Sequence, residues 1–231
     1  MRITLVGYGK TGRIVEKIAR EQNHDIVHVV NSKNPIDCSD SRTDWASKSD
    51  VVIDFSVSTA VVNNVEMAFQ VGVPIVIGTT GWNEELEKIS KLTDSKKGAC
   101  VYASNFSLGV QMLFHLTAEV GRLLSRFGDF HPFILESHHE EKVDKPSGTA
   151  LSLHKILQKS CDLDAVISSI RAGFFPGTHL VGLDSPFETL VLEHTARNRE
   201  GFARGALLAA EWIRDKKGFY SFEEILFGGE K

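Results

Sequence analysis

The sequence has few of the features that mark secreted, metal-stabilised or membrane-embedded proteins. Its three cysteines stand far apart at positions 38, 100 and 161 and form no Cys-x-x-Cys pair. That distribution argues against a disulfide framework and against a zinc site. No apolar run approaches the length of about eighteen residues that a transmembrane helix needs. The chain also opens without the apolar region of a signal peptide. We therefore expect a cytoplasmic protein.

An excess of basic charge is missing as well. There are 26 lysine and arginine residues against 30 aspartate and glutamate residues, giving a formal net charge of −4. The chain therefore offers no basic surface that would attract nucleic acid or an anionic membrane. At 231 residues it is long enough for one large domain or two small domains with a real core.

A dinucleotide-binding pattern begins the chain. An apolar run over residues 2–6 leads into Gly7-Tyr8-Gly9-Lys10-Thr11-Gly12, and apolar residues then recur at helical spacing over 14–19. Residues 26–30 form the next predicted strand. In a strand, G-x-G-x-x-G, helix arrangement the glycines allow a tight turn and a close approach of the backbone to a pyrophosphate. We predict cofactor binding here; the alternative is a tight turn without a ligand.

Strands and helices continue to alternate through the first half. The pattern predicts strands at 51–55, 74–77 and 100–103, helices at 60–71 and 83–97, and a loop with at most one short helix over 31–50. Such alternation is typical of a Rossmann-type, doubly wound parallel α/β sheet. Ligands of such sheets bind at the carboxyl ends of the strands. The loops at Gly7, Gly78 and Asn105 should meet at that edge.

The second half has a different pattern. A long helix is predicted after Ser107, and strands are predicted at 133–136, 166–171, 179–183 and 189–195. Turn sequences at 175–177 and 184–186 separate the last three strands and give hairpin-like signals. An alanine- and leucine-rich helix over 202–213 closes the pattern. We therefore expect a second α+β domain with an antiparallel or mixed sheet.

The stretch from residue 136 to residue 150 reads E-S-H-H-E-E-K-V-D-K-P-S-G-T-A. Adjacent side chains on a strand point to opposite faces, so only one of His138 and His139 is expected to face a reacting group. Lys142 supplies a flexible cation suited to an anionic substrate. Pro146 to Thr149 has the composition of a helix start, whose free N–H groups favour anions. The stretch therefore offers a proton donor, a cation and an anion site; the alternative is a polar loop with incidental histidines.

The pattern H-H-x-x-K-x-D-x-P-S-G-T-A resembles the catalytic segment of the dihydrodipicolinate reductases, also called 4-hydroxy-tetrahydrodipicolinate reductases, of bacterial lysine and diaminopimelate synthesis. The resemblance covers nearly the whole chain in order. Gly78-Thr79-Thr80 resembles the family's G-T-T turn near the nicotinamide, and Ala103-Ser104-Asn105-Phe106 resembles its N-F loop. The strings S-I-R-A-G at 169–173 and G-F-Y-S-F at 218–222 also match.

The resemblance implies a dinucleotide-binding domain of residues 1–106 and 198–231. It also implies a substrate-binding and oligomerisation domain of residues 107–197, with a sheet used in tetramer assembly. The implied reaction is hydride transfer from NADPH or NADH to a cyclic, doubly carboxylated, unsaturated substrate. A metal ion has no part in it.

Residue roles follow from the same resemblance. His138 matches the acid/base and Lys142 the second proton donor. His139 matches a substrate contact, and Gly148 and Thr149 match the pair that holds a substrate carboxylate. These residue types suit the implied reaction, because a substrate with two carboxylates needs cationic and N–H partners. The arriving hydride also leaves negative charge on the substrate, which a proton must neutralise.

The end of the second predicted strand bears on the choice of coenzyme. An acid at this position usually bonds the ribose of NAD and repels a 2′-phosphate. Here the position is Asn31, which carries no charge, and Ser32 and Lys33 follow it. We predict that Asn31 and Ser32 contact the coenzyme and that NADPH binds at least as well as NADH. The alternative is that Lys33 points into solvent.

Several positions depart from the family pattern. The phosphate loop is one residue shorter than the usual G-x-x-G-x-x-G, Lys145 replaces the usual alanine, and Glu140-Glu141 replaces a more basic or polar pair. The stretch from 149 to 169 is also shorter than usual. These departures affect the contacts of the phosphate loop and the outer loop of the second domain, not the expected chemistry.

The remaining histidines have no mutual spacing typical of a metal site, and each is interpreted as a surface or satisfied partly buried side chain: His24, His28, His115, His131, His154, His179 and His194. For Arg171, Arg197 and Arg199 contacts between domains are favoured over cofactor or substrate contacts. Asp54 either lines the cofactor site or makes a structural hydrogen bond. Two rival functions remain: another two-domain amino- or imino-acid dehydrogenase, and an inactive nucleotide-sensing protein.

Overall fold

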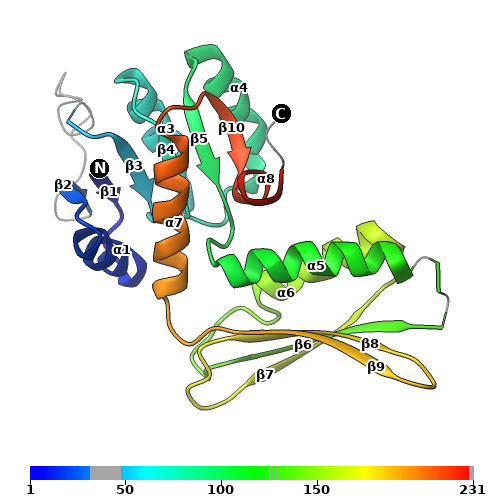
Figure 1. Cartoon of the computed structure of the whole chain (residues 1–231). Coiled ribbons are helices and arrows are strands. Elements are labelled where there is room, and N and C mark those ends of the chain that lie inside the picture. The colour runs from blue at the N-terminus through cyan, green and yellow to red at the C-terminus, as the bar shows by residue number, and fades with distance from the viewer. Residues whose placement is uncertain (32–47, 125, 128, 229–231) are drawn as a thin grey trace. The chain divides into compact units, whose positions relative to one another are not determined.

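The computed structural model describes residues 1–31, 48–124, 126–127 and 129–228 of the chain (Figure 1). The chain forms two compact units. The first comprises Met1–Ser107 and Arg199–Lys231, and the second comprises Leu108–Asn198. Within the described residues, no helix has the length and apolar character needed to cross a membrane.

A six-stranded parallel sheet forms the centre of the first unit. Its strand order is β10-β5-β4-β3-β1-β2, and every pairing in it is parallel. The strands are β1 (Arg2–Val6), β2 (Asp25–Val30), β3 (Val51–Asp54), β4 (Ile75–Ile77), β5 (Ala99–Tyr102) and β10 (Gly218–Ser221). Because β1 lies between β2 and β3, the chain reverses its direction of sheet building at β1. A ligand cleft is expected at such a switch point.

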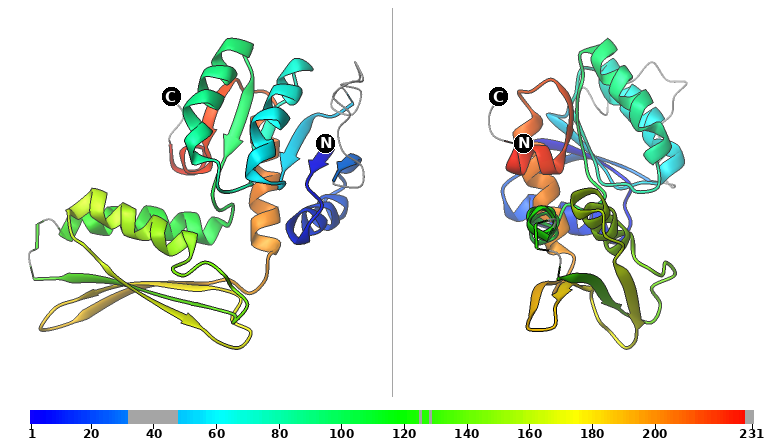
Figure 2. Two further views of the ribbon diagram at one scale, coloured as in Figure 1. Left: turned by 180° about the vertical axis from the view of Figure 1, so that it is seen from behind. Right: turned by 90° about the vertical axis from the view of Figure 1, so that its right-hand side faces the viewer.

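Helices cover both faces of this sheet, as the edge-on view in Figure 2 shows. One apolar core joins the sheet to α1 (Lys10–Glu21), α7 (Glu200–Ile213) and α8 (Phe222–Phe227). The other core joins it to α3 (Val61–Gln70) and α4 (Leu86–Lys96), which are preceded by short 3-10 turns, η1 (Ser58–Ala60) and η2 (Asn83–Glu85). Burial on both faces explains why the inner strands β3, β4 and β5 are almost wholly apolar. The predicted doubly wound sheet is confirmed.

The last strand and helix, β10 and α8, lie beyond the elements that the sequence pattern predicted. β10 pairs in parallel with β5 and places Ser221 at the start of α8. There the Ser221 hydroxyl accepts a hydrogen bond from the Glu224 N–H, while the Glu224 side chain accepts one from the Ser221 N–H. This reciprocal cap has the sequence signature Ser-x-x-Glu. That signature was the available signal for α8.

The second unit has a four-stranded sheet in the order β7-β6-β8-β9. The strands are β6 (His131–His138), β7 (Val166–Arg171), β8 (Thr178–Asp184) and β9 (Thr189–Thr195). Two helices, α5 (Leu108–Leu124) and α6 (Gly148–Cys161), pack on one face of the sheet around Ile134 and Val181. β6 is parallel to β7 and antiparallel to β8. The expected mixed α+β architecture is confirmed, whereas the hairpin-like turn at 175–177 joins two strands that do not pair.

Strand β6 is longer than predicted and ends at His138 rather than at Glu136. Its side chains alternate between the two faces, and Ile134, Glu136 and His138 are all buried. A glutamate and a histidine therefore continue the inward-facing row of an apolar strand. Burial of charged groups in such a row requires hydrogen-bonded partners.

Candidate active site

The glycine loop of the first unit depends on close backbone contacts. Gly7 has φ +89°, and a Cβ atom at this position would lie 2.2 Å from the carbonyl oxygen of Phe55. At Gly12 a Cβ atom would lie 2.2 Å from the carbonyl oxygen of Gly7. A side chain at Gly7 would push the loop away from the end of β3, and one at Gly12 would push the start of α1 away from Gly7. The glycines therefore hold the turn tightly against the edge of the sheet where β1 and β3 end.

Two adjoining cavities follow this edge. One, of about 630 Å³, is lined by Gly7, Tyr8, Gly9, Val30, Asn31, Asn63 and Asn64 among others. The second, of about 330 Å³, is lined by Lys10, Thr11, Gly78, Thr79, Thr80 and Arg199. Gly9, Phe55 and Ser56 line both, so the cavities form a continuous groove across the switch point.

Not every predicted cofactor residue lines this groove. Gly12 is buried in the packing of the turn. Ala103, Ser104, Asn105 and Phe106 follow β5 outside the lining of both cavities. Phe106 is buried between Phe55 and Phe222, and Asn105 Oδ1 accepts a hydrogen bond from the Ser107 N–H. Ser32 and Lys33 lie outside the described residues.

Asp54 holds three segments of the groove together. Its carboxylate is fully buried, and Oδ1 accepts hydrogen bonds from the Ser56 N–H at 2.7 Å and the Thr79 hydroxyl at 2.9 Å. Oδ2 accepts a third from the Asn64 side-chain amide at 2.9 Å. Asp54 therefore supports the groove from behind, which agrees with the second of its two interpretations, a structural hydrogen bond. Arg199, expected to contact the other domain, lines the groove instead.

The lining of this groove contains groups that could hold the phosphates of a dinucleotide. Gly9 is the N-cap of α1, and nothing lies within 4 Å of a Cβ atom placed there, so the backbone at the helix start is open to a ligand. Helix N-termini and exposed N–H groups favour phosphates. The polar side chains of Lys10, Thr11 and Asn31 border the same space.

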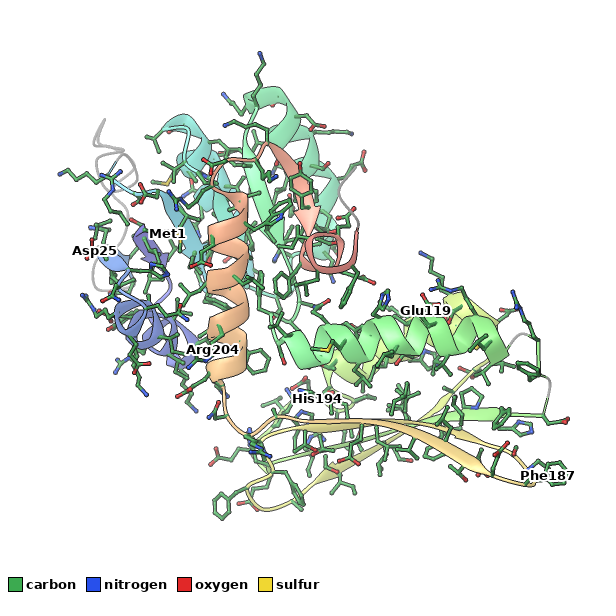
Figure 3. The ribbon with its side chains drawn as sticks, in the orientation of Figure 1. Met1, Asp25, Glu119, Phe187, His194 and Arg204 are labelled. Atoms are coloured by element: carbon green, nitrogen blue, oxygen red, sulfur yellow. The ribbon has the colours of Figure 1, made fainter. Side chains whose placement is uncertain are left out.

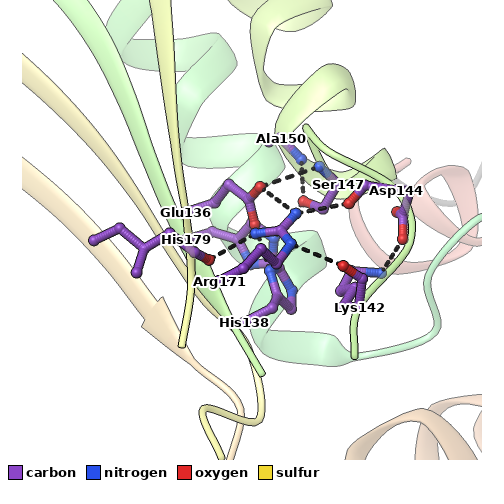
Figure 4. A network of polar contacts seen from close by, with 9 residues as sticks. Glu136, His138, Lys142, Asp144, Ser147, Ala150, Arg171 and His179 are labelled. Atoms are coloured by element: carbon purple, nitrogen blue, oxygen red, sulfur yellow. Dashed lines mark hydrogen bonds and ion pairs between the residues drawn. The ribbon is translucent and has the colours of Figure 1, made fainter. Parts of the chain in front are cut away.

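A polar cluster in the second unit lies where β6 ends and α6 begins (Figure 4). Ser147 is the N-cap of α6, and its Oγ accepts a hydrogen bond from the Ala150 N–H at 3.2 Å. Gly148, which is exposed, and Thr149, which is half-buried, form the first turn beside it. The predicted helix start is confirmed, and its first turn already binds an anionic group, because the Gly148 backbone donates a hydrogen bond to the Asp144 carboxylate.

Glu136 is the centre of this cluster. Its Oε2 bonds to Nδ1 of His138, while its Oε1 accepts hydrogen bonds from Arg171 Nη2 at 2.7 Å and the Ser147 N–H at 3.3 Å. The Glu136 side chain is fully buried and that of Arg171 is 11% exposed. A buried carboxylate thus links β6 to β7 and to the start of α6.

The Lys142 loop is attached to the same cluster. Arg171 donates through Nε to the Lys142 carbonyl oxygen at 3.2 Å and through Nη2 to the Asp144 carbonyl oxygen at 2.7 Å. Lys142 Nζ lies 2.8 Å from Asp144 Oδ1, and its side chain is partly exposed. An interdomain contact was the favoured interpretation of Arg171. That expectation was wrong, because Arg171 is bound to Glu136 and to this loop.

His179, on β8, is a further member of the cluster. Its ring centre lies 5.0 Å from that of His138, and its Nε2 lies 3.0 Å from Ser147 Oγ. Its Nδ1 is buried and has no hydrogen-bond partner among the described residues, as is also true of Nδ1 of His194, its cross-strand neighbour. The interpretation of His179 as a surface or satisfied partly buried histidine was wrong, because its side chain is buried and Nδ1 is left without a partner among the described residues. Strand pairing, which sequence spacing does not reveal, brings it to His138.

His139, the neighbour of His138, lies just beyond the end of β6. It is half-buried, and its N–H donates to the Phe175 carbonyl oxygen at 2.9 Å. The two histidines therefore differ in environment, as expected for adjacent residues of an extended segment. Only His138 belongs to the buried network.

Burial and charge set the ionisation of this cluster. Burial alone raises the pKa of Glu136, but hydrogen bonds from Arg171, Ser169 and His138 outweigh it and lower this pKa to about 2. Burial lowers the pKa of His138 and outweighs the opposing effect of Glu136. It also lowers the pKa of His179 to about 4, and the charge of His138 acts in the same direction. At neutral pH the cluster holds an ionised glutamate beside two neutral imidazoles.

By distance alone, Glu136, His138 and His179 could together hold a metal ion. Both oxygens of Glu136 already have partners, however, and Arg171 places a positive charge beside them. A divalent cation would have to displace these contacts next to that guanidinium. The arrangement favours a network for positioning a proton over a metal centre.

Comparisons with known proteins find relatives that match both parts of the chain. Residues 1–106 match the family model described as dihydrodipicolinate reductase, N-terminus, and residues 109–226 match the model for its C-terminus. The chain is 35% identical to a 4-hydroxy-tetrahydrodipicolinate reductase of Christiangramia forsetii, with 98% of each chain covered. It is 33% identical to the enzyme of the same name from Methanospirillum hungatei, again with 98% of each covered.

Solved structures show the same fold. The dipicolinate-bound dihydrodipicolinate reductase from Paenisporosarcina sp. TG-14 matches with a TM-score of 0.76 at 20% identity, covering 97% of this chain and 99% of that one. Aspartate semialdehyde dehydrogenase II from Vibrio cholerae matches with a TM-score of 0.56 at 11% identity, covering 91% and 97% respectively. At these identities the likeness concerns the fold alone.

The fold and the groove define an NAD(P)H-dependent oxidoreductase built from a dinucleotide-binding unit and a second, α+β unit. Within that class, the two family matches and the full-length relatives identify the family. The chain belongs to the dihydrodipicolinate reductases, the 4-hydroxy-tetrahydrodipicolinate reductases of lysine and diaminopimelate biosynthesis.

Proposed function

We propose that this chain reduces 4-hydroxy-tetrahydrodipicolinate to tetrahydrodipicolinate by adding one hydride and one proton and releasing the 4-hydroxyl group as water, with His138 and Lys142 as its proton donors. The observation that carries the assignment is the placement of His138. Its imidazole is buried at the end of β6, bound to Glu136 on one side, within the unit that also presents Lys142 and the first turn of α6. A bound NADPH or NADH supplies the hydride. The residues of the second unit bind the dicarboxylate and supply the proton.

The substrate carboxylates would be held by groups around the start of α6. The N–H groups of Gly148 and Thr149 lie in the first turn of the helix, where the helix dipole favours an anion. The Asp144 carboxylate, which the Gly148 backbone binds in the free protein, would give way to a substrate carboxylate. Lys142 would meet a carboxylate by exchanging its ion pair with Asp144 for one with the substrate. His139 would contact the substrate from the end of β6.

The charge of the substrate would also prepare the acid. In the free protein, burial keeps His138 neutral near pH 7 by lowering its pKa. A dianion bound beside it would raise this pKa, because nearby negative charge favours the imidazolium. His138 would then carry a proton only when substrate is present. Such coupling places the proton donor in the correct state for quenching the charge that hydride arrival creates.

For the coenzyme, we propose use of both NADPH and NADH. Asn31 ends β2 and lines the larger cavity of the groove, at the position where an acid would disfavour a 2′-phosphate. Ser32 and Lys33 follow directly in the sequence. We also propose that the reaction takes place in the cytoplasm.

The second unit supports a proposal of homotetramer assembly. Helices α5 and α6 cover only one face of its sheet (Figure 1), and the opposite face carries exposed apolar side chains, including Val166, Ile170 and Val191. Phe187 projects at the tip of the β8–β9 turn (Figure 3). Exposed apolar surface of this kind marks an interaction site. Val191→Asp should lower the mass measured by light scattering; an unchanged mass would argue against assembly through this face.

The direct test of the function is coenzyme consumption on addition of freshly prepared substrate. A simple keto acid serves as the control, because another amino- or imino-acid dehydrogenase would accept it. An inactive nucleotide-sensing protein would bind NADPH but oxidise it with neither compound. Oxidation with the cyclic dicarboxylate alone is the result that the proposal expects.

A further inference from the structure

Resting on the proposed function, we infer that Glu136 is the positioning residue for His138: it fixes the tautomer of the imidazole so that Nε2 is the atom that transfers the proton. Glu136 itself is fully buried and does not need to touch substrate. Four observations on the second unit support the inference.

The first observation is the bond between the two side chains. Glu136 and His138 are two residues apart on β6 and share its buried face, and Glu136 Oε2 contacts His138 Nδ1. An ionised carboxylate has no proton to donate, so the hydrogen must lie on Nδ1 of the neutral ring. Nε2 is then left with its lone pair, ready to receive a proton and return it to substrate.

The second observation is the space beside Nε2. Gly177 lies next to this atom and has φ +135°, and a Cβ atom at Gly177 would lie 3.1 Å from Nε2 and 3.2 Å from Cδ2 of His138. Any larger residue would crowd the proposed reacting atom and would be strained by its backbone conformation. The absence of a side chain at Gly177 keeps Nε2 accessible.

The third observation is that Glu136 is itself held in place. Its other oxygen, Oε1, accepts hydrogen bonds from Arg171 and from the Ser147 N–H. Arg171 in turn holds the carbonyl oxygens of Lys142 and Asp144. One buried ion pair thus sets the position of His138 and of the loop that carries the other proton donor.

The fourth observation concerns charge. The groups that face His138 are Glu136 on its own strand, Arg171 on β7, His179 on β8 and Lys142 in the following loop. Of these, only Glu136 favours the imidazolium. Replacing this carboxylate by a neutral amide should therefore lower the pKa of His138 and weaken its ability to hold a proton.

The experiment compares Glu136→Gln and Glu136→Asp with the unmodified enzyme and with Glu140→Gln, which removes an exposed acid four residues away. Glu136→Gln should lower kcat about a hundredfold, because a misoriented imidazole or the wrong tautomer is costly in catalytic dyads of this kind. The pH above which kcat declines should move to a lower value. Dissociation constants for NADPH and dipicolinate should change less than threefold or so, since Glu136 is proposed to contact neither.

Glu136→Asp should recover part of the lost rate and restore the pH profile, whereas Glu140→Gln should match the unmodified enzyme. A Glu136→Gln enzyme with the original pH profile and rate would overturn the inference. So would a rate loss that is accompanied by an equal loss of dipicolinate binding, because that pattern indicates a substrate contact.

A measurement on the unmodified protein covers the case in which Glu136→Gln does not fold. In ¹⁵N-histidine NMR spectra at a pH where His138 is neutral, its signals should show the Nδ1–H tautomer, with His138→Gln providing the assignment. The Nε2–H tautomer would contradict the inference. This measurement needs no turnover, so it remains valid even if the proposed substrate is not reduced. It therefore distinguishes failure of the inference about Glu136 from failure of the proposed function.

Discussion

Arg171 Nη2 lies 2.7 Å from Glu136 Oε1, although the two residues are 35 positions apart in the chain. Parallel pairing of β6 with β7 brings them together, because Glu136 and Arg171 both lie near the carboxyl ends of these strands. The Glu136 side chain is fully buried and that of Arg171 largely so, and the guanidinium also binds the Lys142 loop. The pair therefore has a structural role as well as its proposed part in positioning His138.

The first prediction concerns the stability of this pair. Arg171→Ala should reduce the free energy of unfolding by about 3 kcal/mol or more, because it leaves a buried carboxylate without its counter-ion. Arg122→Ala, which removes an exposed partner of Glu119, should cost less than about 1 kcal/mol. Denaturant unfolding of both variants measures the difference. Equal effects would show that the Glu136–Arg171 pair is not buried in solution.

The second prediction separates catalysis from cofactor binding. His138→Gln and Lys142→Ala should each lower kcat by a factor of about a hundred or more, as expected for the removal of a positioned proton donor. Affinity for NADPH should stay nearly unchanged, because the groove belongs to the other unit. The exposed His131 and Lys155 offer matched controls as His131→Gln and Lys155→Ala. Normal turnover in both test variants would refute the catalytic assignment.

The third prediction follows from the low pKa of His179. Its pKa is lowered from 6.5 to about 4 in the folded protein, so between these values the unfolded chain binds more protons. The free energy of unfolding is therefore highest above pH 6.5. It decreases as the pH falls towards about 4, by up to roughly 3 kcal/mol from His179. His138 and His194, whose pKa values are also lowered, act in the same direction.

Unfolding curves across this pH range test the effect. His179→Gln should flatten the decline in stability on acidification, while His131→Gln, at an exposed position, should leave it unchanged. The same decline in His179→Gln and in the unmodified protein would mean that His179 is not the titrating group.

The fourth prediction concerns recognition of two carboxylates. Pyridine dicarboxylates should inhibit competitively with substrate, and Thr149→Val should weaken them because it removes a hydroxyl from the first turn of α6. A pyridine monocarboxylate should bind much more weakly, since one of two anion sites would remain empty. The measurement is a comparison of the inhibition constants of the dicarboxylate and the monocarboxylate. Equal constants would be incompatible with two anion sites.

The fifth prediction concerns the coenzyme. NADPH should bind at least as well as NADH, and any advantage should shrink at high salt if Lys33 meets the 2′-phosphate. Asn31→Asp should move the preference towards NADH, because it places a negative charge in the larger cavity of the groove. Dissociation constants for both coenzymes at two salt concentrations provide the measurement. A tenfold or greater preference for NADH in the unmodified protein would contradict the interpretation of this loop.

Much of this architecture could be predicted from local patterns. The glycine turn, the alternation of strands and helices and the N-cap at Ser147 are all encoded over a few neighbouring residues. Gly7, Gly9 and Thr79 were placed correctly at the groove for that reason. The family resemblance added roles for His138 and Lys142, which spacing alone left open.

The parts that were missed depend on long-range pairing. His179 reaches His138 only because β8 pairs with β6, and Arg171 reaches Glu136 only because β7 pairs with it on the other side. Strand order cannot be derived from turn sequences, as the unpaired turn at 175–177 shows. Glu136 was also missed, although its signal was local: once the strand extends to His138, residues 136 and 138 lie on one face.

The central claim is that this chain reduces the cyclic dicarboxylate and that His138 supplies a proton. The most direct measurement is the loss of NADPH absorbance after addition of fresh 4-hydroxy-tetrahydrodipicolinate to the unmodified enzyme and to His138→Gln, each shown to bind NADPH. We predict rapid oxidation of NADPH by the unmodified enzyme and a rate that is lower by a factor of about a hundred or more in the variant. Equal rates in the two proteins, or no oxidation by either, would contradict the account.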